Sequence, residues 1–290
     1  MINNYIKSPM NYIGGKYKIL NQILPLFPKD IECFIDLFSG GCNVGVNVSA
    51  KKIICNDIIH YIIELYEYFK NNALDVTLQE IENVIDKYSL SMTNDIGYKT
   101  LRDSYNENKS PLLLFVLICY SFNHQIRYNN SHKFSTPFGR NRSCYNENIK
   151  TNLKRFIDTI KAKDITFTSC NFKNMDFSQL THKDFVYCDP PYLITVGSYN
   201  DGKRGFEGWG YNEEIYLLNL LDSLHKQNIR FALSNVLKHK GKENKILLEW
   251  LSDNSTTYNI HHLSTTYANS SYHCANINNR TSDEVLITNY

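Results

Sequence analysis

The amino-acid sequence predicts an α/β fold: a doubly wound, mostly parallel sheet with antiparallel terminal strands and an inserted, largely helical domain. Three observations support this prediction. An apolar strand near the N-terminus runs into a glycine turn, the alternation of strand and helix lapses over residues 59–163, and it then resumes with further buried strands. A strand, a glycine turn and a helix open the doubly wound sheets that bind nucleotide-like ligands at their carboxyl edge.

The first candidate ligand contact is the segment 7–16, with the sequence KSPMNYIGGK. Its two adjacent glycines allow a tight turn or a close approach of the backbone to a ligand. Tyr12 and Lys16 flank them. A helix is expected over residues 17–24, ending at Pro25. An ordinary N-terminal loop and helix cap is the alternative interpretation of this segment.

The glycine turn at residues 39–45 follows an apolar strand over residues 33–38 and precedes a stretch expected to be helical over residues 46–50. Its spacing is neither the Gly-x-Gly-x-x-Gly of dinucleotide-binding proteins nor that of a phosphate-binding loop. A dinucleotide or a triphosphate is therefore poorly supported, although the turn remains suited to another nucleotide-like ligand.

A second strand, over residues 52–56, ends in Asp57. An acid at this place in a doubly wound sheet can accept hydrogen bonds from both hydroxyls of a ribose. Asp57 can instead cap the helix expected over residues 58–69, because an aspartate oxygen accepts well from the first backbone N–H groups of a helix. The sequence leaves both roles open.

The insertion is predicted to contain helices over residues 78–87 and 112–122, followed by an irregular segment that is rich in Asn, Arg and aromatic residues. From Phe122 to Lys163 there are nine Lys or Arg and two acids, so this stretch carries +7 and the remainder −5. Long irregular segments are uncommon unless they have a function. Basic residues interleaved with aromatics suit contacts with phosphates, base edges and stacked bases, whereas a plain surface loop is the alternative.

Residues 189–192, Asp-Pro-Pro-Tyr, end a buried strand over residues 184–188. The two prolines have no N–H and keep the backbone extended, so that the carbonyls of Asp189 and Pro190 are left to face a ligand. These acceptors can hold the two hydrogens of an amino group on a flat ring, and Tyr192 can stack on that ring. A strand end with a simple turn is the alternative.

The remaining pattern predicts the C-terminal half of the sheet and the helices that cover it. A glycine-rich loop over residues 193–211 is long enough to act as a lid. Strands are expected over residues 165–170 and 229–233, helices over 213–227 and 242–252, and a terminal antiparallel pair over 258–263 and 284–288.

Composition limits the class of protein further. With 290 residues, 42% of them hydrophobic, the chain is one large domain or a domain with an insertion, and a monomer is favoured. Its eight cysteines include no Cys-x-x-Cys pair and no zinc-like Cys/His spacing, which indicates reduced thiols, a cytoplasmic location and no metal. The first ten residues lack an apolar signal region, and the longest apolar run is too short to cross a membrane.

Taken together, the motifs resemble the Dam-like D12 group of DNA adenine-N6 methyltransferases over the whole chain. Residues 7–16 resemble the N-terminal cofactor motif of that group, residues 38–42 (FSGGC) its Phe-x-Gly-x-Gly motif, and residues 189–192 its catalytic motif. Residues 127–129 (RYN) and 134–140 (FSTPFGR) are similar to the recognition segment of the Dam enzymes. The order of cofactor motif, insertion and catalytic motif is also the same.

This resemblance implies a Rossmann-like methyltransferase sheet formed by residues 1–58 and 164–290, with a target-recognition insertion over residues 59–163. It implies that the sheet binds S-adenosylmethionine without a metal. The expected reaction moves a methyl group to N6 of an adenine flipped out of double-stranded DNA, within a short site for which GATC is the leading candidate. A cognate restriction endonuclease is a candidate functional partner.

The resemblance also assigns residues to roles. Catalysis is assigned to Asp189, Pro190 and Tyr192. Cofactor binding is assigned to Tyr12, Lys16, Phe38, Ser39, Gly40, Asp57, Phe172 and Asp189. Contacts with DNA are assigned to Phe122, Asn123, Arg127, Tyr128, Asn129, Lys133, Pro137 and Arg140.

Among the DNA-binding residues, Arg140 is expected to pair with a guanine, because its guanidinium offers two parallel donors to O6 and N7. Arg127 is expected to do the same or to hold a phosphate, and Lys133 is expected to contact a phosphate. Phe122 or Tyr128 would wedge into the base stack where the adenine leaves.

Two positions depart from the family pattern. Cys42 stands where the motif usually has a second glycine, and a positive φ there would strain a cysteine. His124 and Gln125 replace a small glycine-containing turn of the Dam enzymes, which leaves the target sequence open. The alternative functions are an RNA or protein N-methyltransferase of the same fold and a catalytically silent DNA-binding descendant. A nucleotide-dependent oxidoreductase is disfavoured because its glycine fingerprint is absent.

Overall fold

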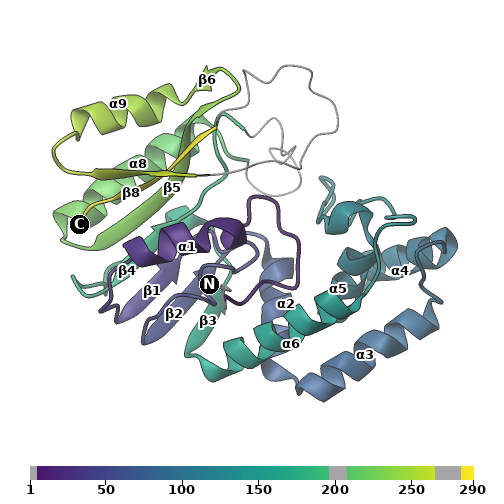
Figure 1. The fold of residues 1–290 in the computed structure, drawn as a ribbon. Helices are drawn as coiled ribbons and strands as arrows, with labels where there is room; N and C mark the ends of the chain where they lie inside the picture. The colour runs from purple at the N-terminus through teal and green to yellow at the C-terminus, as the bar shows by residue number, and fades with distance from the viewer. Residues whose placement is uncertain (1–4, 196–207, 265–281) are drawn as a thin grey trace.

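The computed structural model describes residues 5–195, 208–264 and 282–290. These residues form one eight-stranded sheet with the order β3-β2-β1-β4-β5-β8-β7, in which β6 pairs with β5 (Figure 1). The strands are β1 (Cys33–Asp36), β2 (Lys52–Asn56), β3 (Ile165–Thr168), β4 (Phe185–Cys188), β5 (Arg230–His239), β6 (Lys242–Glu243), β7 (Asn259–Leu263) and β8 (Asp283–Thr288).

The sheet has the mostly parallel topology that the sequence predicts. β1, β2, β3, β4 and β5 pair in parallel, whereas β8 runs antiparallel between β5 and β7. The chain order reverses between β1 and β4, whose pairing places Asp36 opposite Tyr187. In doubly wound sheets a ligand binds at such a reversal, because the connections leave both strand ends in opposite directions and open a crevice.

Helices cover both faces of the sheet. They are α1 (Leu20–Ile23), α2 (His60–Asn71), α3 (Leu74–Lys87), α4 (Asp95–Glu107), α5 (Pro111–Tyr120), α6 (Glu147–Ala162), α8 (Tyr211–Lys226) and α9 (Lys245–Asp253), with 3-10 turns η1 (Lys16–Ile19), η2 (Leu24–Leu26), η3 (Phe122–His124) and η4 (Phe172–Asn174). Successive residues of β1 face opposite layers, because strand side chains alternate. Phe34 packs in the core with α1, α2, α5 and α6, and Ile35 packs in the core with α8 and α9.

The inserted helices form a lobe beside β3 (Figure 1). α5 lies at its centre and packs against α2, α3 and α4. Its sequence, PLLLFVLICY, is apolar all round, as expected of a helix enclosed by others, and Pro111 occupies its first turn, where a missing N–H costs nothing. The core of the lobe is continuous with one face of the sheet, and the division into two domains stays a prediction.

Three local differences separate the structure from the sequence-based expectation. Residues 46–50 are not helical but form turns, in which Val48 N donates to Val44 O at 3.0 Å. α4 and α6 lie in sequence whose polar, Asn-rich composition hides them. Yet both begin with an asparagine cap, since Asn94 accepts from Gly97 N and Asn146 from Ile149 N.

Part of the expected lid lies outside the described residues, because they omit 196–207. The cysteines that the structure describes are all free thiols. No helix in the described part of the chain is long and apolar enough to span a membrane.

Candidate active site

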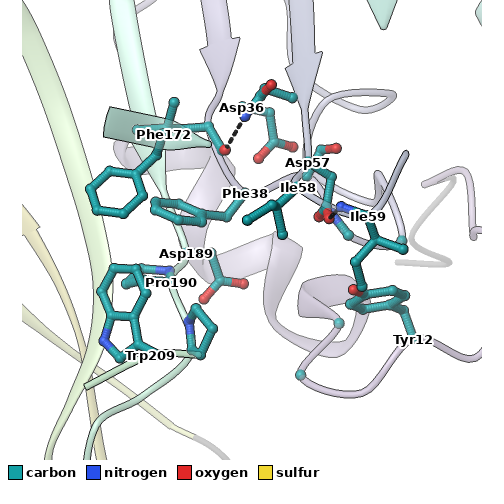
Figure 2. A pocket seen from close by; sticks show the side chains of 18 of the residues that line it. Tyr12, Asp36, Phe38, Asp57, Ile58, Ile59, Phe172, Asp189, Pro190 and Trp209 are labelled. Carbon is teal, nitrogen blue, oxygen red and sulfur yellow. Dashed lines mark hydrogen bonds between the residues drawn. The ribbon is translucent and has the colours of Figure 1, made fainter. Parts of the chain in front are cut away.

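A cavity of about 250 Å³ opens at the carboxyl edge of the parallel strands, where the chain order reverses (Figure 2). Every residue that the sequence predicts for catalysis or for the cofactor lines it: Tyr12, Lys16, Phe38, Ser39, Gly40, Asp57, Phe172, Asp189, Pro190 and Tyr192. The structure thus brings together residues from five separate segments, spread over 181 positions from Tyr12 to Tyr192. Their individual roles stay predictions.

The glycine turn after β1 forms one side of this cavity. Gly40 has φ +44°, and a Cβ there would lie 2.8 Å from the ring of Tyr12, so only glycine fits. The turn is fixed from behind, because Gly40 O accepts from Tyr66 Oη at 2.6 Å and Gly40 N donates to Asp57 Oδ2 at 2.8 Å. The N-terminal motif and the glycine turn are therefore packed as one unit.

Cys42 occupies the left-handed region, with φ +57°. The position therefore requires the conformation for which the family motif supplies glycine, and a non-glycine residue there costs about 1–2 kcal/mol. Cys42 is fully buried, its Sγ lies 3.2 Å from Cys55 Sγ, and its side chain points away from the cavity lining. The strain is thus held by packing behind the turn.

Asp57 is buried, and each of its oxygens already accepts a backbone hydrogen bond. Oδ2 accepts from Gly40 N, and Oδ1 accepts from Ile59 N at 2.9 Å, just before α2. Burial raises the pKa of this carboxyl. Since a carboxylate has about four acceptor positions, ribose contact remains available to Asp57 while it orders the turn. Asp57 thus orders the turn before α2 without capping the helix itself, whose N-cap is Ile59, and its ribose contact stays a prediction.

Asp36 is a site residue that the sequence analysis misses. It is the last residue of β1, is 2% exposed and lines the cavity, and its Oδ2 accepts from Gly45 N at 3.1 Å. Burial, and then the charge of nearby Asp189, raise the pKa of Asp36 to about 8. The available signal was an acid at the very end of the first strand, directly before the glycine turn.

Three aromatic rings form a wall on one side of the cavity, opposite Tyr12 (Figure 2). The ring centroids of Phe38 and Phe172 are 5.2 Å apart, and that of Trp209 lies 5.5 Å from Phe38 and 5.4 Å from Phe172. Buried Glu214 accepts from Trp209 Nε1 at 2.7 Å and so fixes the indole. The sequence analysis placed Trp209 only in a lid, and it missed this contribution to the cavity.

The Asp-Pro-Pro-Tyr motif follows β4, as predicted, and its acid faces the cavity. The side chain of Asp189 is 17% exposed, and its Oδ1 lies 2.7 Å from Lys16 Nζ and accepts from Tyr192 Oη at 3.2 Å. Burial raises the pKa of Asp189, although Lys16 opposes that shift. Pro190 and Tyr192 are buried beside it.

Lys16, which the sequence assigns to the cofactor, lies at the catalytic end of the cavity. Its ammonium contacts Asp189, donates to Gly14 O at 3.0 Å and lies 4.9 Å above the ring of Tyr192. The N-terminal glycine motif therefore holds this cation against the carboxylate of Asp189. Lys16 still lines the cavity, so a cofactor contact remains compatible with this position.

A second hollow, of about 550 Å³, lies in the irregular segment after α5, and we call it the reading hollow. Its lining consists of Arg127, Tyr128, Asn129, Asn130, Ser131, Ser135 and Pro137. Four of the eight residues predicted to bind DNA belong to it. Tyr128 borders both this hollow and the main cavity, which places the two side by side.

The structure corrects the expected wedge at Tyr128. Its ring is 3% exposed, stacks on Tyr61 with centroids 4.6 Å apart, and its hydroxyl pairs with Tyr105 Oη at 2.7 Å. A ring held in this way joins the lobe to the cavity and does not project from the surface. Phe122 is 38% exposed and is the one of the two candidates that the structure presents to solvent.

The other four residues predicted to bind DNA, Phe122, Asn123, Lys133 and Arg140, do not line the hollow. Phe122 lies under the guanidinium of Arg142, 4.8 Å from its ring centroid, and Asn123 has φ +55° and accepts from Arg142 Nη1 at 3.5 Å. Lys133 and Arg140 lie outside the hollow, and Arg140 is exposed in a turn. Arg142 escaped the sequence analysis, although it stands two residues after Arg140 in the same basic segment.

The irregular segment between α5 and α6, which we call the reading segment, contacts the N-terminal glycine motif directly. Asn11 Nδ2, next to Tyr12, donates to the backbone carbonyl of Asn123 at 3.1 Å. Arg127 donates to Gln125 Oε1, which orients its guanidinium. Within the residues described, no group of three or more His, Cys, Asp or Glu side chains is arranged to hold a metal ion.

The fold is a doubly wound α/β sheet with a cavity at its strand reversal, and an Asp-Pro-Pro-Tyr motif lies beside that cavity. The family model of the D12 class N6 adenine-specific DNA methyltransferases matches residues 12–269. The chain therefore belongs to that family, and the resemblance inferred from the motifs is confirmed.

Curated relatives place the chain within this family. It is 52% identical over 288 residues to the type II methyltransferase M.FokI of Planomicrobium okeanokoites, and 53% identical over 286 residues to the modification methylase StsI of Streptococcus sanguinis. Each alignment covers 99% of this chain and 43% of the relative, so the chain spans less than half their length. A DNA adenine methylase of Haemophilus influenzae is 28% identical over 234 residues, 78% of either chain.

The comparison with solved structures gives distant likenesses. The rRNA methyltransferase aviRa of Streptomyces viridochromogenes aligns at 10% identity with a TM-score of 0.36, covering 93% of this chain and 82% of that chain.

Proposed function

We propose that this chain transfers a methyl group from S-adenosylmethionine to N6 of an adenine in double-stranded DNA. The observation that carries the proposal is the position of Asp189. Its carboxylate faces a cavity lined with nucleotide-binding motifs, and that cavity adjoins the reading hollow through Tyr128. Membership of the D12 family supports the same chemistry.

The cavity suits S-adenosylmethionine on two physical grounds. Three carboxylates line it, those of the buried Asp36 and Asp57 and of the half-buried Asp189, and carboxylates removed from water favour a ligand with positive charge, such as a sulfonium and an ammonium group. The rings of Phe38 and Phe172 offer apolar faces against which an adenine can stack. Because the glycine turn has no side chain at Gly40, the backbone can approach the ligand closely.

The chain's own residues prepare the amino group. When bound, S-adenosylmethionine supplies an electrophilic methyl group. The carboxylate of Asp189 and the carbonyl of Pro190 accept the two hydrogens of N6, which weakens the conjugation of the nitrogen lone pair with the ring and directs that pair outward. After methylation the nitrogen must lose one proton, and Asp189 is the acceptor already bonded to it. Positioning of this kind supplies most of the rate enhancement.

The insertion is proposed to bind the duplex. Its +7 stretch attracts the phosphate backbone, and Phe122, exposed beside Arg142, can fill the gap that a flipped adenine leaves. The contact between Asn11 and the carbonyl of Asn123 couples the reading segment to the N-terminal glycine motif. A base read by the segment is thereby kept in register with the catalytic carboxylate.

The relatives support the target sequence and the biological partner less directly than they support the reaction. GATC stays a prediction, because it rests on likeness to Dam, whereas the chain is 52–53% identical to the two methylases and 28% identical to the DNA adenine methylase. M.FokI is named as a type II methyltransferase, and the StsI protein is named as a modification methylase. We therefore propose that this chain protects sites from a cognate restriction endonuclease.

The proposal is tested by incubating the purified chain with S-adenosylmethionine and an unmethylated plasmid, and by reading the modified positions with single-molecule sequencing. The expected product is N6-methyladenine at one short motif, with Asp189→Asn as the inactive control. Parallel incubations with RNA and with protein distinguish the other acceptor classes. Methylation of cytosine, or of RNA or protein in preference to DNA, would overturn the proposal.

A further inference from the structure

The strand β8, far from the catalytic motif in the sequence, sends a buried acid to the active site. Glu284 is 1% exposed, and its Oε1 accepts from Tyr192 Oη at 3.0 Å and lies 3.7 Å from Lys16 Nζ. A carboxylate at this depth is costly unless other groups compensate it. Lys16 and Tyr192 contribute to this compensation, and the same two groups hold the carboxylate of Asp189.

We propose that Glu284 is a positioning residue for methyl transfer, which holds Tyr192 and Lys16 so that they fix the carboxylate of Asp189. This inference rests on the proposed function, and it adds Glu284 behind the two groups that hold Asp189. Among the described residues, the hydrogen bonds that Asp189 accepts through its side chain all go to Oδ1, from Lys16 and from Tyr192. The other oxygen, Oδ2, is thereby directed toward the cavity and the target amino group.

This arrangement gives the hydroxyl of Tyr192 a role in addition to stacking by its ring. The hydroxyl has one proton and two carboxylate oxygens nearby, at 3.0 Å from Glu284 and 3.2 Å from Asp189. A single donor that bridges two acceptors ties their positions together. From the sequence alone, Tyr192→Phe is expected to retain much of the turnover, because only stacking is invoked. The structure predicts instead that loss of the hydroxyl releases Asp189.

The charge of Glu284 also acts on Asp189. The groups that face Asp189 are Lys16 from η1, Glu284 from β8, Asp36 from β1, and Tyr187, Cys188 and Tyr192 from its own segment. Burial is the main cause of the raised pKa of Asp189, Lys16 opposes it, and the negative charge of Glu284 adds to it. Because Asp189 must be ionised to accept the N6 hydrogens, activity falls as the pH drops through this pKa.

Glu284→Gln, which keeps the shape and removes the charge, tests the proposal. We expect kcat on duplex DNA to fall about 10- to 100-fold, with unchanged affinity for S-adenosylmethionine. The acid limb of kcat/KM should move to lower pH, because the pKa of Asp189 falls when the neighbouring negative charge is lost. Asp283→Asn is the matched control, since Asp283 is the preceding residue of β8 and pairs with exposed His262 on the surface. It should leave all of these quantities unchanged.

Two further variants separate positioning from a merely structural role. If Glu284 acts through the hydroxyl, the double variant Glu284→Gln with Tyr192→Phe should be no slower than the slower single variant, because the two share one pathway. Tyr192→Phe leaves Glu284 in place, and it keeps the test decisive if Glu284→Gln fails to fold. Wild-type kcat in a folded Glu284→Gln or Tyr192→Phe variant would overturn the proposal.

A measurement without turnover distinguishes failure of this inference from failure of the proposed function. With ¹³C-labelled aspartate, the carboxyl resonance that disappears in Asp189→Asn identifies Asp189. Its titration should move to lower pH in Glu284→Gln and stay in place in Asp283→Asn. An unmoved titration would contradict the inference, even if the wild-type chain methylates some other acceptor.

Discussion

The catalytic cavity and the reading segment, which adjoin each other, are held in opposite ways. In the cavity the acidic side chains are bonded to other elements, as Asp57 is to the glycine turn and to Ile59 before α2. In the reading segment most of the side chains predicted to meet DNA are exposed, Tyr128 being buried and Arg127 half-buried, and two isolated backbone bridges pair Ser121 with Phe138 and Tyr128 with Phe134. Under the proposed function, the chemistry therefore depends on the sheet edge, and the choice of target depends on the loop.

Backbone conformation sharpens this contrast. Four non-glycine residues of the reading segment have a positive φ, namely Asn123, His124, His132 and Asn141. All four are Asn or His, which adopt this left-handed region more readily than most other residues. At the cavity, Gly14 and Gly40 have a positive φ, and so does the buried Cys42 of the glycine turn. The shape of the loop is therefore set largely by its own residues, and substitutions there should alter the loop without affecting the sheet.

The largest expected effect comes from a substitution in the catalytic cavity. Asp189→Asn should lower kcat by about 10²–10⁴-fold, because the amide loses the charge that accepts from N6 and takes up the proton. Affinity for S-adenosylmethionine should change little, since the partner of Asp189 is the target base. Single-turnover methylation and calorimetry measure the two quantities. Turnover near the wild-type rate would refute the assigned role of Asp189.

A second variant tests whether the aromatic wall belongs to the cofactor site. Trp209→Ala should weaken S-adenosylmethionine binding about 10- to 100-fold, if the indole contributes the stacking energy usual for a base on an aromatic ring. Trp209→Phe should keep most of the affinity. The chain has two tryptophans, and Trp250 lies in α9 outside the cavity lining, so Trp250→Phe leaves Trp209 as the only tryptophan fluorophore. Ligand binding without any change in its fluorescence would place the cofactor elsewhere.

These two variants also divide what sequence could predict from what it could not. The Asp-Pro-Pro-Tyr motif and the glycine turn were predictable because prolines and glycines restrict the backbone locally. Asp189 is therefore found from the sequence alone. The contribution of Trp209 depends on Glu214, and that of Glu284 on Lys16 and Tyr192, and such pairings of distant residues leave no local signal.

The same reasoning explains the errors in the insertion. α5 was predictable because it is continuously apolar, whereas α4 presents only Tyr98, Leu101 and Tyr105 to the core among polar neighbours. Tyr128 was expected at the surface because it lies in a polar segment. Its burial depends on Tyr61 and Tyr105, which come from two helices at a distance in the sequence.

Substitutions of the arginines test the reading segment. Arg140→Ala, and separately Arg127→Ala, should each cost about 1–3 kcal/mol and relax the preference at one base pair, if each guanidinium reads a guanine. Lys133→Ala should instead weaken every sequence alike and lower the salt slope by about one unit. The measurement profiles all single-base variants of the mapped site. Equal weakening of every variant by Arg140→Ala would make Arg140 a phosphate contact.

The smallest expected effect concerns the protonation of Asp36. It tests whether the carboxyl of Asp36 ionises when a cationic ligand binds. The pKa of Asp36 is raised to about 8, chiefly by burial, so at pH 7 the carboxyl is mostly protonated before ligand binds. A positively charged ligand favours the ionised form, so binding should release a proton. Affinity should accordingly rise with pH and level off above about pH 8.

Calorimetry at pH 7 in buffers of different ionisation enthalpy measures this release directly. We expect S-adenosylmethionine to release a fraction of one proton, and S-adenosylhomocysteine to release less, because it lacks the sulfonium charge. Asp36→Asn should bind more weakly and release none. Release that persists in Asp36→Asn would assign the proton to Asp57 or Asp189, whose pKa values burial also raises. Equal release by both ligands would show that the acid faces the ammonium end of the cofactor and not its methyl group.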